Sequence, residues 1–257
     1  MTVLQSLLDF ALDATWQAGR VTLRYFQAGV AVERKGDDTP VTMADRESEQ
    51  HLRSLISRYY PDHGIVGEEF GEQVGKTDYR WIIDPIDGTK SFISGFPTYG
   101  CLLALVERDR PLIGVAHFPA LGETVYAALG GGCYWNGRRA RVSLLGKLAD
   151  ATLLGSEISR DWGDHVSAWQ RLNMATYIQR TWGDSYGYAM IATGRAEIMI
   201  DPKMHIWDSA PFGVILPEAG GTFTDWQGNA TITSVQTVAT NGALFEPVIG
   251  LINQKPE

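Results

Sequence analysis

Residues 81–89 read WIIDPIDGT, an apolar run that stops at two carboxylates and a glycine-containing turn. The opening Trp-Ile-Ile consists of the aromatic and β-branched residues that strands prefer, so it predicts a buried strand. Asp84 and Asp87 follow at its end. The ends of strands and the loops after them are where proteins of mixed α and β structure place many functional residues. The stretch therefore predicts a strand that delivers two carboxylates to a site.

The second half of the stretch has the features of an anion site. Pro85 fixes the backbone, and the carbonyl oxygen of Ile86 is left available as a ligand. Gly88 and Thr89 come directly before Lys-Ser-Phe-Ile, which fits the first turn of a helix. Backbone N–H groups at such a turn bind anions. Carboxylates and anion-binding amides this close together suit a phosphate that is bridged to a metal ion.

Two further segments place acids after apolar residues: GIVGEEF, with Glu68 and Glu69, and HIWD, which ends in Asp208. We interpret both as strand ends that converge on the first stretch. Two like charges about 4 Å apart repel by about 4 kcal/mol at an effective dielectric constant of about 20, so such a cluster needs cations. The ligands are hard oxygens without His or Cys, which favours Mg²⁺ or Mn²⁺ over Zn²⁺. Two Mg²⁺ ions held by shared carboxylates would serve phosphoryl transfer.

The rest of the chain predicts the α+β class. Apolar residues recur at helical spacing over 4–26, and Thr42 to Asp45 form a capping box for a second helix that runs to about Tyr59. Residues 101–129 are rich in β-formers, with turn signals that indicate an antiparallel meander. After residue 150 short strands (TLLGSE, YIQRTW, EIMID, TFTDW, TVATN) alternate with helices expected near 164–175, 185–194, 208–219 and from about 243.

Composition excludes several functional classes. The 257 residues carry a net charge of −8, and the short basic run at 136–142 fits a solvated turn, so no nucleic-acid partner is expected. No apolar run approaches the roughly 18 residues that a membrane helix needs, and no membrane contact is expected. The N-terminal segment lacks a basic region and predicts an amphipathic helix rather than a signal peptide, so we expect a cytoplasmic protein. Cys101 and Cys133 are expected to be free buried thiols.

In this order along the chain, VTMAD at 41–45, GEE at 67–69, WIIDPIDGT, WDSAP at 207–211 and EAGG at 218–221 resemble the motifs of the inositol monophosphatase superfamily. The resemblance spans nearly the whole chain. It implies a layered αβαβα sandwich of the inositol monophosphatase and sugar phosphatase type, formed by residues 1–257 as a single domain. It also implies a homodimer and Mg²⁺-dependent, lithium-sensitive hydrolysis of small phosphomonoesters.

The resemblance also implies roles for individual residues. The metal ligands would be Glu68, Asp84, the carbonyl oxygen of Ile86, Asp87 and Asp208, holding two Mg²⁺ ions and a third, weaker one beside Glu68. The catalytic set that orients and activates the water would be Glu69, Thr89 and Asp45, with Thr89 paired to Asp45. The residues around the substrate would be Glu68, Ile86, Asp87, Gly88, Thr89, Asp184, Asp201 and Asp208. Lys35 is expected over the site on a loop.

Three segments resemble the histidinol-phosphatase branch of the superfamily. Two of them are DGTKSFISGFP at 87–97 and TWGDSYGYAMIATGRAEIMIDP at 181–202, where inositol-cleaving members carry other residues. The third is WDSAPFGVILPEAGGTFTDWQG at 207–228. The resemblance implies hydrolysis of L-histidinol phosphate in histidine biosynthesis. The alternative is a phosphatase for inositol 1-phosphate or another small sugar phosphate.

The sequence GDSYG at 183–187 also matches the nucleophile elbow of serine hydrolases. That reading is disfavoured because the one downstream histidine, His205, is poorly spaced for a catalytic base. We expect instead that Asp184 and Asp201 bind a cationic leaving group through charge-assisted hydrogen bonds, with Ser185 as a bystander. Asp184 as a plain helix N-cap is the simpler alternative. A non-catalytic partner protein is disfavoured by the complete set of metal ligands.

Overall fold

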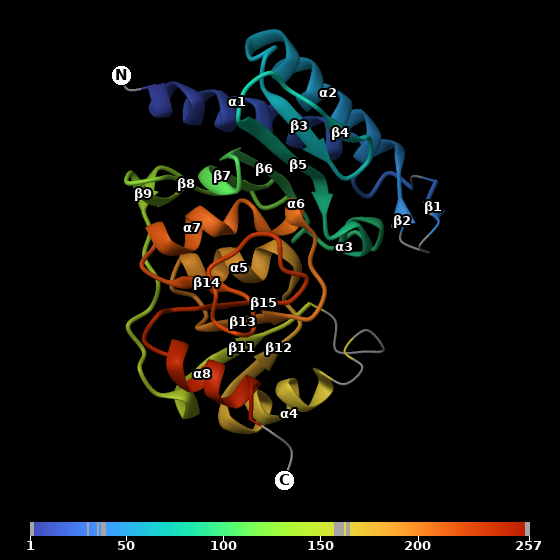
Figure 1. Cartoon of the computed structure of the whole chain (residues 1–257). Coiled ribbons are helices and arrows are strands. Elements are labelled where there is room, and N and C mark those ends of the chain that lie inside the picture. The colour runs from blue at the N-terminus through green and yellow to red at the C-terminus, as the bar shows by residue number, and fades with distance from the viewer. Residues whose placement is uncertain are drawn as a thin grey trace.

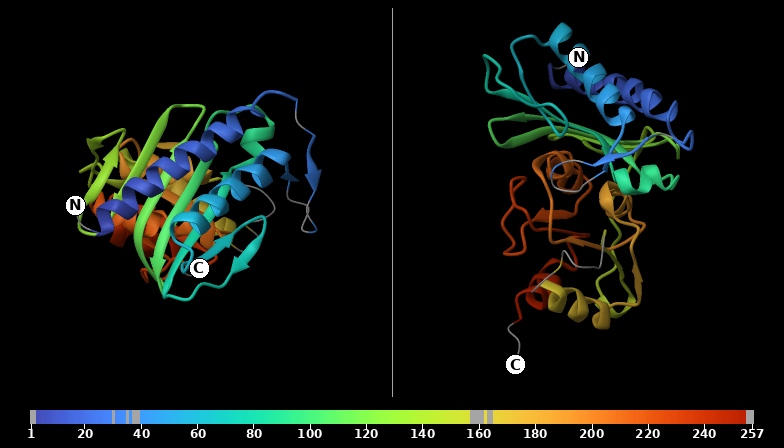
Figure 2. Two further views of the ribbon diagram at one scale, coloured as in Figure 1. Left: turned by 90° about the horizontal axis from the view of Figure 1, so that it is seen from above. Right: turned by 90° about the vertical axis from the view of Figure 1, so that its right-hand side faces the viewer.

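The computed structural model describes residues 3–29, 31–34, 36, 40–156, 162 and 165–254. Lys35 and the loop position expected for it lie outside these described residues. The described elements stack in five layers, which are seen from two sides in Figures 1 and 2. Helices α1 (Val3–Leu23) and α2 (Met43–Tyr59) form the outer layer at the N-terminal end.

The second layer is an eight-stranded sheet. Its spatial order is β10 (Arg138–Arg139), β9 (Gly132–Trp135), β8 (Glu123–Ala128), β7 (Arg110–Phe118), β6 (Gly100–Glu107), β5 (Tyr79–Asp87), β3 (Gly64–Gly67) and β4 (Gly71–Gln73). Only the β3–β5 pair is parallel, and the run from β6 to β9 is the expected antiparallel meander. The central strands β5 to β7 are buried along most of their length because helices cover both faces of the sheet.

Below the sheet lie α5 (Asp184–Ala192), α6 (Ile206–Ser209) and α7 (Phe212–Glu218), followed by a five-stranded sheet. The order of that sheet is β12 (Ile178–Arg180), β11 (Thr152–Leu154), β13 (Ile198–Asp201), β15 (Thr237–Thr240) and β14 (Thr222–Thr224). Helices α4 (Val166–Ala175) and α8 (Phe245–Ile252) form the fifth layer. This arrangement is the αβαβα sandwich that was expected. The remaining elements are β1 (Glu33–Arg34), β2 (Pro40–Val41), α3 (Thr89–Ile93) and a 3₁₀ turn at Leu148–Asp150.

Most of the expected elements are confirmed within one or two residues, but the segment 208–219 is not one helix. It divides into α6 and α7, which meet at Pro211, the N-cap residue of α7. Proline has no N–H to continue the hydrogen bonds of a preceding helix, so a second helix begins there in a new direction. Our interpretation of HIWD as a strand end is therefore wrong, because Asp208 lies inside the short helix α6.

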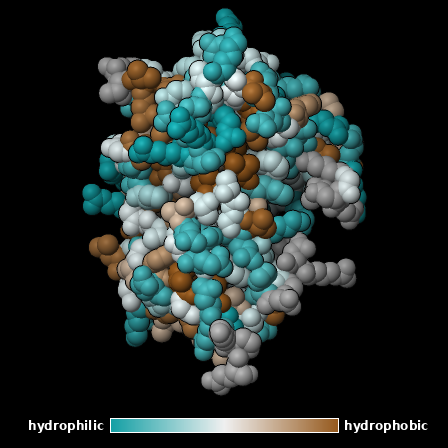
Figure 3. Space-filling model, in the orientation of Figure 1, coloured by the Kyte–Doolittle hydropathy of each residue, from teal (hydrophilic) through white to brown (hydrophobic). Residues whose placement is uncertain are grey.

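Apolar side chains gather mainly between the layers. One cluster packs α1 and α2 on the eight-stranded sheet, a second fills the space between the two sheets, and a third lies under α4 and α8. The face in Figure 3 is mainly hydrophilic, with apolar side chains in small separate patches. Among the described helices, none has the length and apolar character that a membrane crossing requires.

Gly19 is a point of close approach between α1 and the end of β7. A Cβ atom at this position would lie 2.6 Å from His117 Cδ2 and 2.8 Å from Pro119 Cγ. His117 is held in place by a 2.8 Å hydrogen bond between its Nδ1 and Thr124 Oγ1. The position therefore needs a residue without a side chain.

We expect Gly19→Ala to destabilise the protein by about 1–2 kcal/mol, because overpacking outweighs the helix propensity gained from alanine. Thermal unfolding should show a Tm lower by about 2–8 °C. The matched control is Gly250→Ala in α8, where a Cβ atom meets nothing within 4 Å. That exposed helical substitution should raise the Tm. An unchanged or raised Tm in Gly19→Ala would show that the helix can shift away from His117.

Candidate metal and phosphate site

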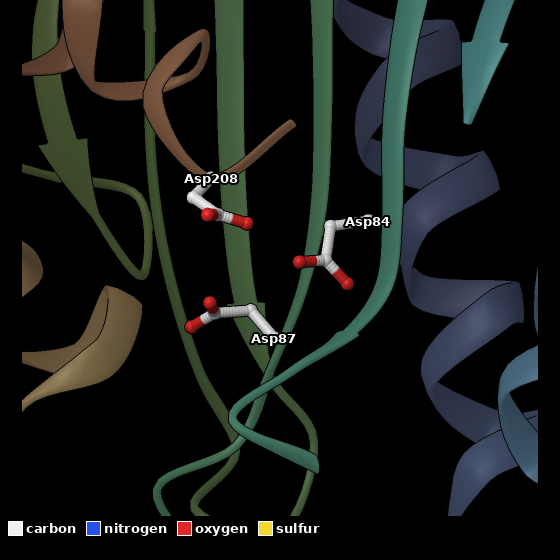
Figure 4. Close-up of side chains that lie close together, drawn as sticks. All are labelled: Asp84, Asp87 and Asp208. Carbon is white, nitrogen blue, oxygen red and sulfur yellow. The ribbon is translucent and has the colours of Figure 1, made fainter. Parts of the chain in front are cut away.

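Three aspartates from two distant segments meet at the site. Asp84 and Asp87 come from the end of β5, and Asp208 comes from α6. One carboxylate oxygen from each lies within 4.8 Å of the other two, and Figure 4 shows the three carboxyl groups turned toward a common centre. Asp208 is more than 100 residues away from Asp84 and Asp87 in the chain, so only the folded sheet and α6 bring the three together.

A β-bulge explains how both aspartates of β5 reach the same place. Residues three apart in a regular strand point to opposite faces of the sheet. Here Asp84 pairs with Leu102 and Asp87 pairs with Gly100, so β5 has one residue more than β6 over this interval. The extra residue falls in the Pro85–Ile86 segment and resets the alternation. Pro85 of WIIDPIDGT therefore lies in the bulge that brings the two carboxylates to the same place.

Backbone N–H groups hold the three aspartates in place. Asp84 Oδ1 accepts from Ile86 N at 3.0 Å, and Asp208 Oδ2 accepts from His205 N at 2.8 Å. Asp87 Oδ2 accepts from Ser185 N at 2.6 Å, in the first turn of α5. Each bond fixes one oxygen of the carboxylate and thereby orients the group as a whole.

The site carries more negative charge than buried carboxylates tolerate alone. Burial, followed by the charges of Glu68, Asp87 and Asp208, raises the pKa of Asp84 well above its usual value. Burial, Asp184 and Asp208 do the same for the pKa of Asp87. Burial raises the pKa of Asp208 to about 7, against the opposing hydrogen bond from His205. A divalent cation would relieve this repulsion, and an all-oxygen donor set fits Mg²⁺ or Mn²⁺.

Glu68 belongs to this carboxylate cluster, whereas Glu69 is held in place by a hydrogen bond from its backbone N–H. Glu68 follows β3, lines the same cavity as the aspartates and contributes to the raised pKa values of Asp84 and Asp208. Its backbone N–H donates to Ile83 O at 3.3 Å. Glu69 N donates to Glu49 Oε2 at 2.7 Å, so the turn is attached to β5 on one side and to α2 on the other.

The expected pairing of Thr89 with Asp45 is absent from the structure. Thr89 Oγ1 donates to the carbonyl oxygen of Ile86 at 3.2 Å. Asp45 Oδ2 accepts from both the backbone N (2.8 Å) and the hydroxyl (2.7 Å) of Thr42, which completes the predicted capping box. Asp45 Oδ1 is buried without a hydrogen-bond partner in the described part of the chain. Burial raises the pKa of Asp45 to about 6, so its own cap bonds only partly offset the desolvation.

A cavity of about 600 Å³ connects the aspartates with the Gly88–Thr89 turn. Gly88, the N-cap of α3, adopts a left-handed backbone (φ 78°) that favours glycine, and Thr89 begins the helix. The cavity contains every predicted metal ligand and substrate residue. Its described lining is Pro40, Glu68, Asp84, Ile86, Asp87, Gly88, Thr89, Lys90, Ser91, Ser156, Thr181, Asp184, Asp201, Pro202, Lys203, His205, Trp207 and Asp208.

Asp184 lies directly over the Gly88–Thr89 turn. A Cβ atom added to Gly88 would lie 2.7 Å from Asp184 Oδ2, and Ser91 Oγ donates to the same oxygen at 3.2 Å. The N-cap of α5 is Gly183, so the interpretation of Asp184 as a plain N-cap is wrong. Asp184 has a left-handed backbone (φ 52°), which is uncommon outside glycine and is found at functional sites.

Ser156 links Asp184 to Asp201, the second carboxylate on this side of the cavity. Asp184 N donates to Ser156 Oγ at 2.8 Å, and Ser156 N donates to Asp201 Oδ1 at 3.3 Å. Asp201 Oδ2 accepts from the hydroxyl of Tyr188 at 2.8 Å. Burial raises the pKa of Asp201 to about 7, so a bound cation would favour its ionised form. Sequence reasoning missed Ser156 and Tyr188, because both act through partners far away in the chain.

Ser185 is neither a nucleophile nor a bystander. Its side chain is buried, and Oγ has no hydrogen-bond partner among the described residues, so no base is placed to activate it. Its backbone N–H holds Asp87, which makes the start of α5 a support for the metal site. His205 is exposed and stacks on Trp207 with ring centroids 4.8 Å apart. The GDSYG segment thus serves the carboxylate cluster and not a serine triad.

Comparison with known proteins gives a consistent result. The model of the inositol monophosphatase family matches residues 3–257. A histidinol-phosphatase from Chlorobaculum parvum is 40% identical over 250 residues, covering 95% of this chain and 96% of that protein. A fructose-1,6-bisphosphatase/inositol-1-monophosphatase from Thermotoga maritima is 34% identical over 253 residues, covering 97% of each. The solved structure of the extragenic suppressor protein suhB from Bartonella henselae has a TM-score of 0.92 and 26% identity, covering 98% of this chain and 100% of that one.

The chain therefore belongs to the inositol monophosphatase family. The family resemblance and the layered sandwich expected from the sequence are both confirmed.

Proposed function

We propose that this chain is a single-domain, Mg²⁺-dependent phosphatase that hydrolyses L-histidinol phosphate to L-histidinol and phosphate. The observation that carries the proposal is the cavity in which Asp84, Asp87 and Asp208 lie beside the Gly88–Thr89 turn. The 40% identical relative from Chlorobaculum parvum, a histidinol-phosphatase, supports the choice of substrate.

The residues divide into three roles. Glu68, Asp84, the carbonyl oxygen of Ile86, Asp87 and Asp208 would hold two or three divalent ions, with Mn²⁺ able to replace Mg²⁺. Bound Mg²⁺ supplies charge neutralisation of the phosphoryl oxygens and lowers the pKa of a coordinated water. The N–H groups of Gly88 and Thr89 donate to the phosphate. Glu69 accepts a proton from the attacking water, and the Thr89 hydroxyl orients that water.

The reaction exchanges one P–O bond for another. The water oxygen attacks phosphorus, the bond to the ester oxygen breaks, and a proton is returned to that oxygen to give the alcohol. Asp184 and Asp201 line the same cavity beside the Gly88–Thr89 turn, and we place the leaving group against them. Histidinol phosphate carries an ammonium and an imidazole there, and two carboxylates would bind these groups through charge-assisted hydrogen bonds.

A second candidate substrate is inositol 1-phosphate or another small sugar phosphate. Lys90 and Lys203 line the same cavity, and a cation there would suit a hydroxyl-rich or doubly phosphorylated ligand. The Thermotoga maritima relative carries a name with two such substrates. A cationic leaving group is preferred because Asp184 lies against the Gly88–Thr89 turn, where it approaches Gly88 and accepts from Ser91 Oγ.

The experiment is an assay of phosphate release from L-histidinol phosphate and inositol 1-phosphate side by side. We expect activity only with a divalent cation, loss of activity with EDTA, recovery with Mg²⁺ and a higher kcat/KM for L-histidinol phosphate. A serine-directed reagent should have no effect. Equal or reversed kcat/KM values would overturn the substrate assignment, and activity that survives EDTA would overturn the metal-dependent mechanism.

A further inference from the structure

Glu49 is a fully buried carboxylate that the proposed mechanism does not use. It lies on α2, one helical turn after Asp45, and has no exposed surface. Arg53, one further turn along the helix, donates from Nε to Glu49 Oε1 at 2.7 Å. Buried charges are rare unless they are paired and hydrogen bonded, so this pair needs a structural reason.

Both oxygens of Glu49 are occupied by groups of the protein. Oε2 accepts from Glu69 N at 2.7 Å, and Oε1 accepts from Phe70 N at 3.2 Å in addition to Arg53. A Cβ atom added to Gly67 would lie 2.1 Å from Oε1, so the carboxylate is pressed against the backbone at the end of β3. Glu49 therefore accepts hydrogen bonds from the backbone of the turn that follows β3, and it is not a metal ligand.

Arg53 completes the attachment of the same turn. Its Nη2 donates to the carbonyl oxygen of Gly71, and its guanidinium lies 6.0 Å from the centre of the Phe70 ring. The Glu49–Arg53 pair thus contacts the chain at positions 69, 70 and 71. This turn carries Glu68, a proposed metal ligand, and Glu69, which is proposed to activate the water. The other residues proposed for these two roles lie in β5, α3, α6 and at the N-terminus of α2.

We infer that Glu49, supported by Arg53, is a positioning residue that sets the metal affinity of the site by fixing the Glu68–Glu69 turn. The inference rests on the proposed metal function of Glu68. The N–H groups of Glu68 and Glu69 donate to Ile83 O and to Glu49 Oε2, so the turn is held from opposite sides and the Glu68 carboxylate is fixed in place beside the aspartates. Residues that orient metal ligands in this way commonly contribute tenfold to hundredfold to metal affinity or activity.

The test is Glu49→Gln, which keeps the shape of the side chain but removes its charge and one of its acceptor oxygens. Mn²⁺ binding is measured by EPR titration without substrate, on protein shown to be folded by circular dichroism. We expect the Kd for Mn²⁺ to rise by about tenfold, together with the Mg²⁺ concentration needed for half-maximal activity. A purely structural role would lower the Tm and leave the Kd of the folded protein unchanged, which would overturn the inference.

The matched control is Glu47→Gln. Glu47 lies two residues before Glu49 on the same helix and forms an exposed ion pair with Arg24. Its Kd for Mn²⁺ should stay within about twofold of the wild-type value. If Glu49→Gln does not fold, Arg53→Lys is judged by the same measurement, since lysine keeps the charge but cannot contact both Glu49 and Gly71. Unchanged Kd values for Arg53→Lys would then overturn the inference. Wild-type protein that neither binds Mn²⁺ nor shows Mg²⁺-dependent activity would instead overturn the proposed function, and the inference with it.

Discussion

Asp84→Asn is expected to lower kcat/KM by at least about a thousandfold while leaving the fold intact. Asp84 is the most central of the three aspartates, because it interacts with Glu68, Asp87 and Asp208 together. Loss of its charge should remove several kcal/mol of metal-dependent stabilisation from the transition state, and about 4 kcal/mol corresponds to a thousandfold. Steady-state kinetics with saturating Mg²⁺ measures this loss.

The fold should survive because asparagine can make the same contacts. Its Oδ1 can accept from Ile86 N, as Asp84 Oδ1 does at 3.0 Å, and its Nδ2 can donate to the neighbouring carboxylate of Asp208. Removal of one negative charge also reduces the repulsion within the cluster. The Tm of the metal-free variant should therefore equal or exceed that of the metal-free wild type.

The stabilisation that Mg²⁺ gives should fall at the same time, since a ligand stabilises only the state that binds it. Asp109→Asn is the control, because that carboxylate is 78% exposed in a surface ion pair. It should leave kinetics and Mg²⁺-dependent stabilisation unchanged. Retention of more than about a tenth of wild-type kcat/KM in Asp84→Asn would show that the aspartate cluster is not the catalytic metal site.

Local signals in the sequence were sufficient for much of this structure. The strand and the carboxylates of WIIDPIDGT, the capping box at Thr42 and the antiparallel meander were all expected and are confirmed. Each depends on interactions within a few residues, namely strand propensity, a side chain that caps its own helix, and turns between adjacent strands. Such interactions leave a pattern that can be recognised in a short stretch.

Features that depend on distant partners were missed, and one local feature, the capping box of α6, was misread. Asp208 was assigned to a strand end, although its carboxylate caps α6 through His205. Ser185 was assigned no role, yet its backbone N–H binds Asp87, 98 positions away. Glu49 had one usable signal, since residues four apart lie on the same helical face and Asp45 was already a candidate. This spacing predicts the helical face on which Glu49 lies. It does not predict that Glu49 accepts hydrogen bonds from the Glu68–Glu69 turn.

The same distinction applies to substrate choice. The geometry of the cavity places Asp184 above Gly88. The preference for a cationic leaving group depends on the charge of Asp184, and its size is measured by comparing kcat/KM between substrates. We expect wild-type kcat/KM to favour L-histidinol phosphate over inositol 1-phosphate by about a hundredfold, or about 2.7 kcal/mol of transition-state binding.

Asp184→Asn is expected to remove most of that preference, lowering kcat/KM for L-histidinol phosphate by about tenfold to a hundredfold. A hydrogen bond to a charged group contributes about 1.5–3 kcal/mol, and asparagine would lose the charge while still accepting from Ser91. The left-handed backbone at this position (φ 52°) is one that asparagine adopts readily, so the α5 start should keep its geometry. Hydrolysis of inositol 1-phosphate should change by less than about threefold, because a neutral polyol gains little from the charge.

Ser185→Ala is the matched control for this variant, one residue further along α5. Its hydroxyl has no hydrogen-bond partner in the described chain, and the N–H that binds Asp87 remains after the substitution. Both substrates should therefore be hydrolysed at near wild-type rates, which a serine nucleophile would not allow. Equal losses on both substrates in Asp184→Asn would mean that Asp184 acts through Asp87 and the metal site, and that the leaving group is recognised elsewhere in the cavity. A loss confined to the cationic substrate would place the recognition at Asp184, because a weakened metal site would slow the hydrolysis of both substrates.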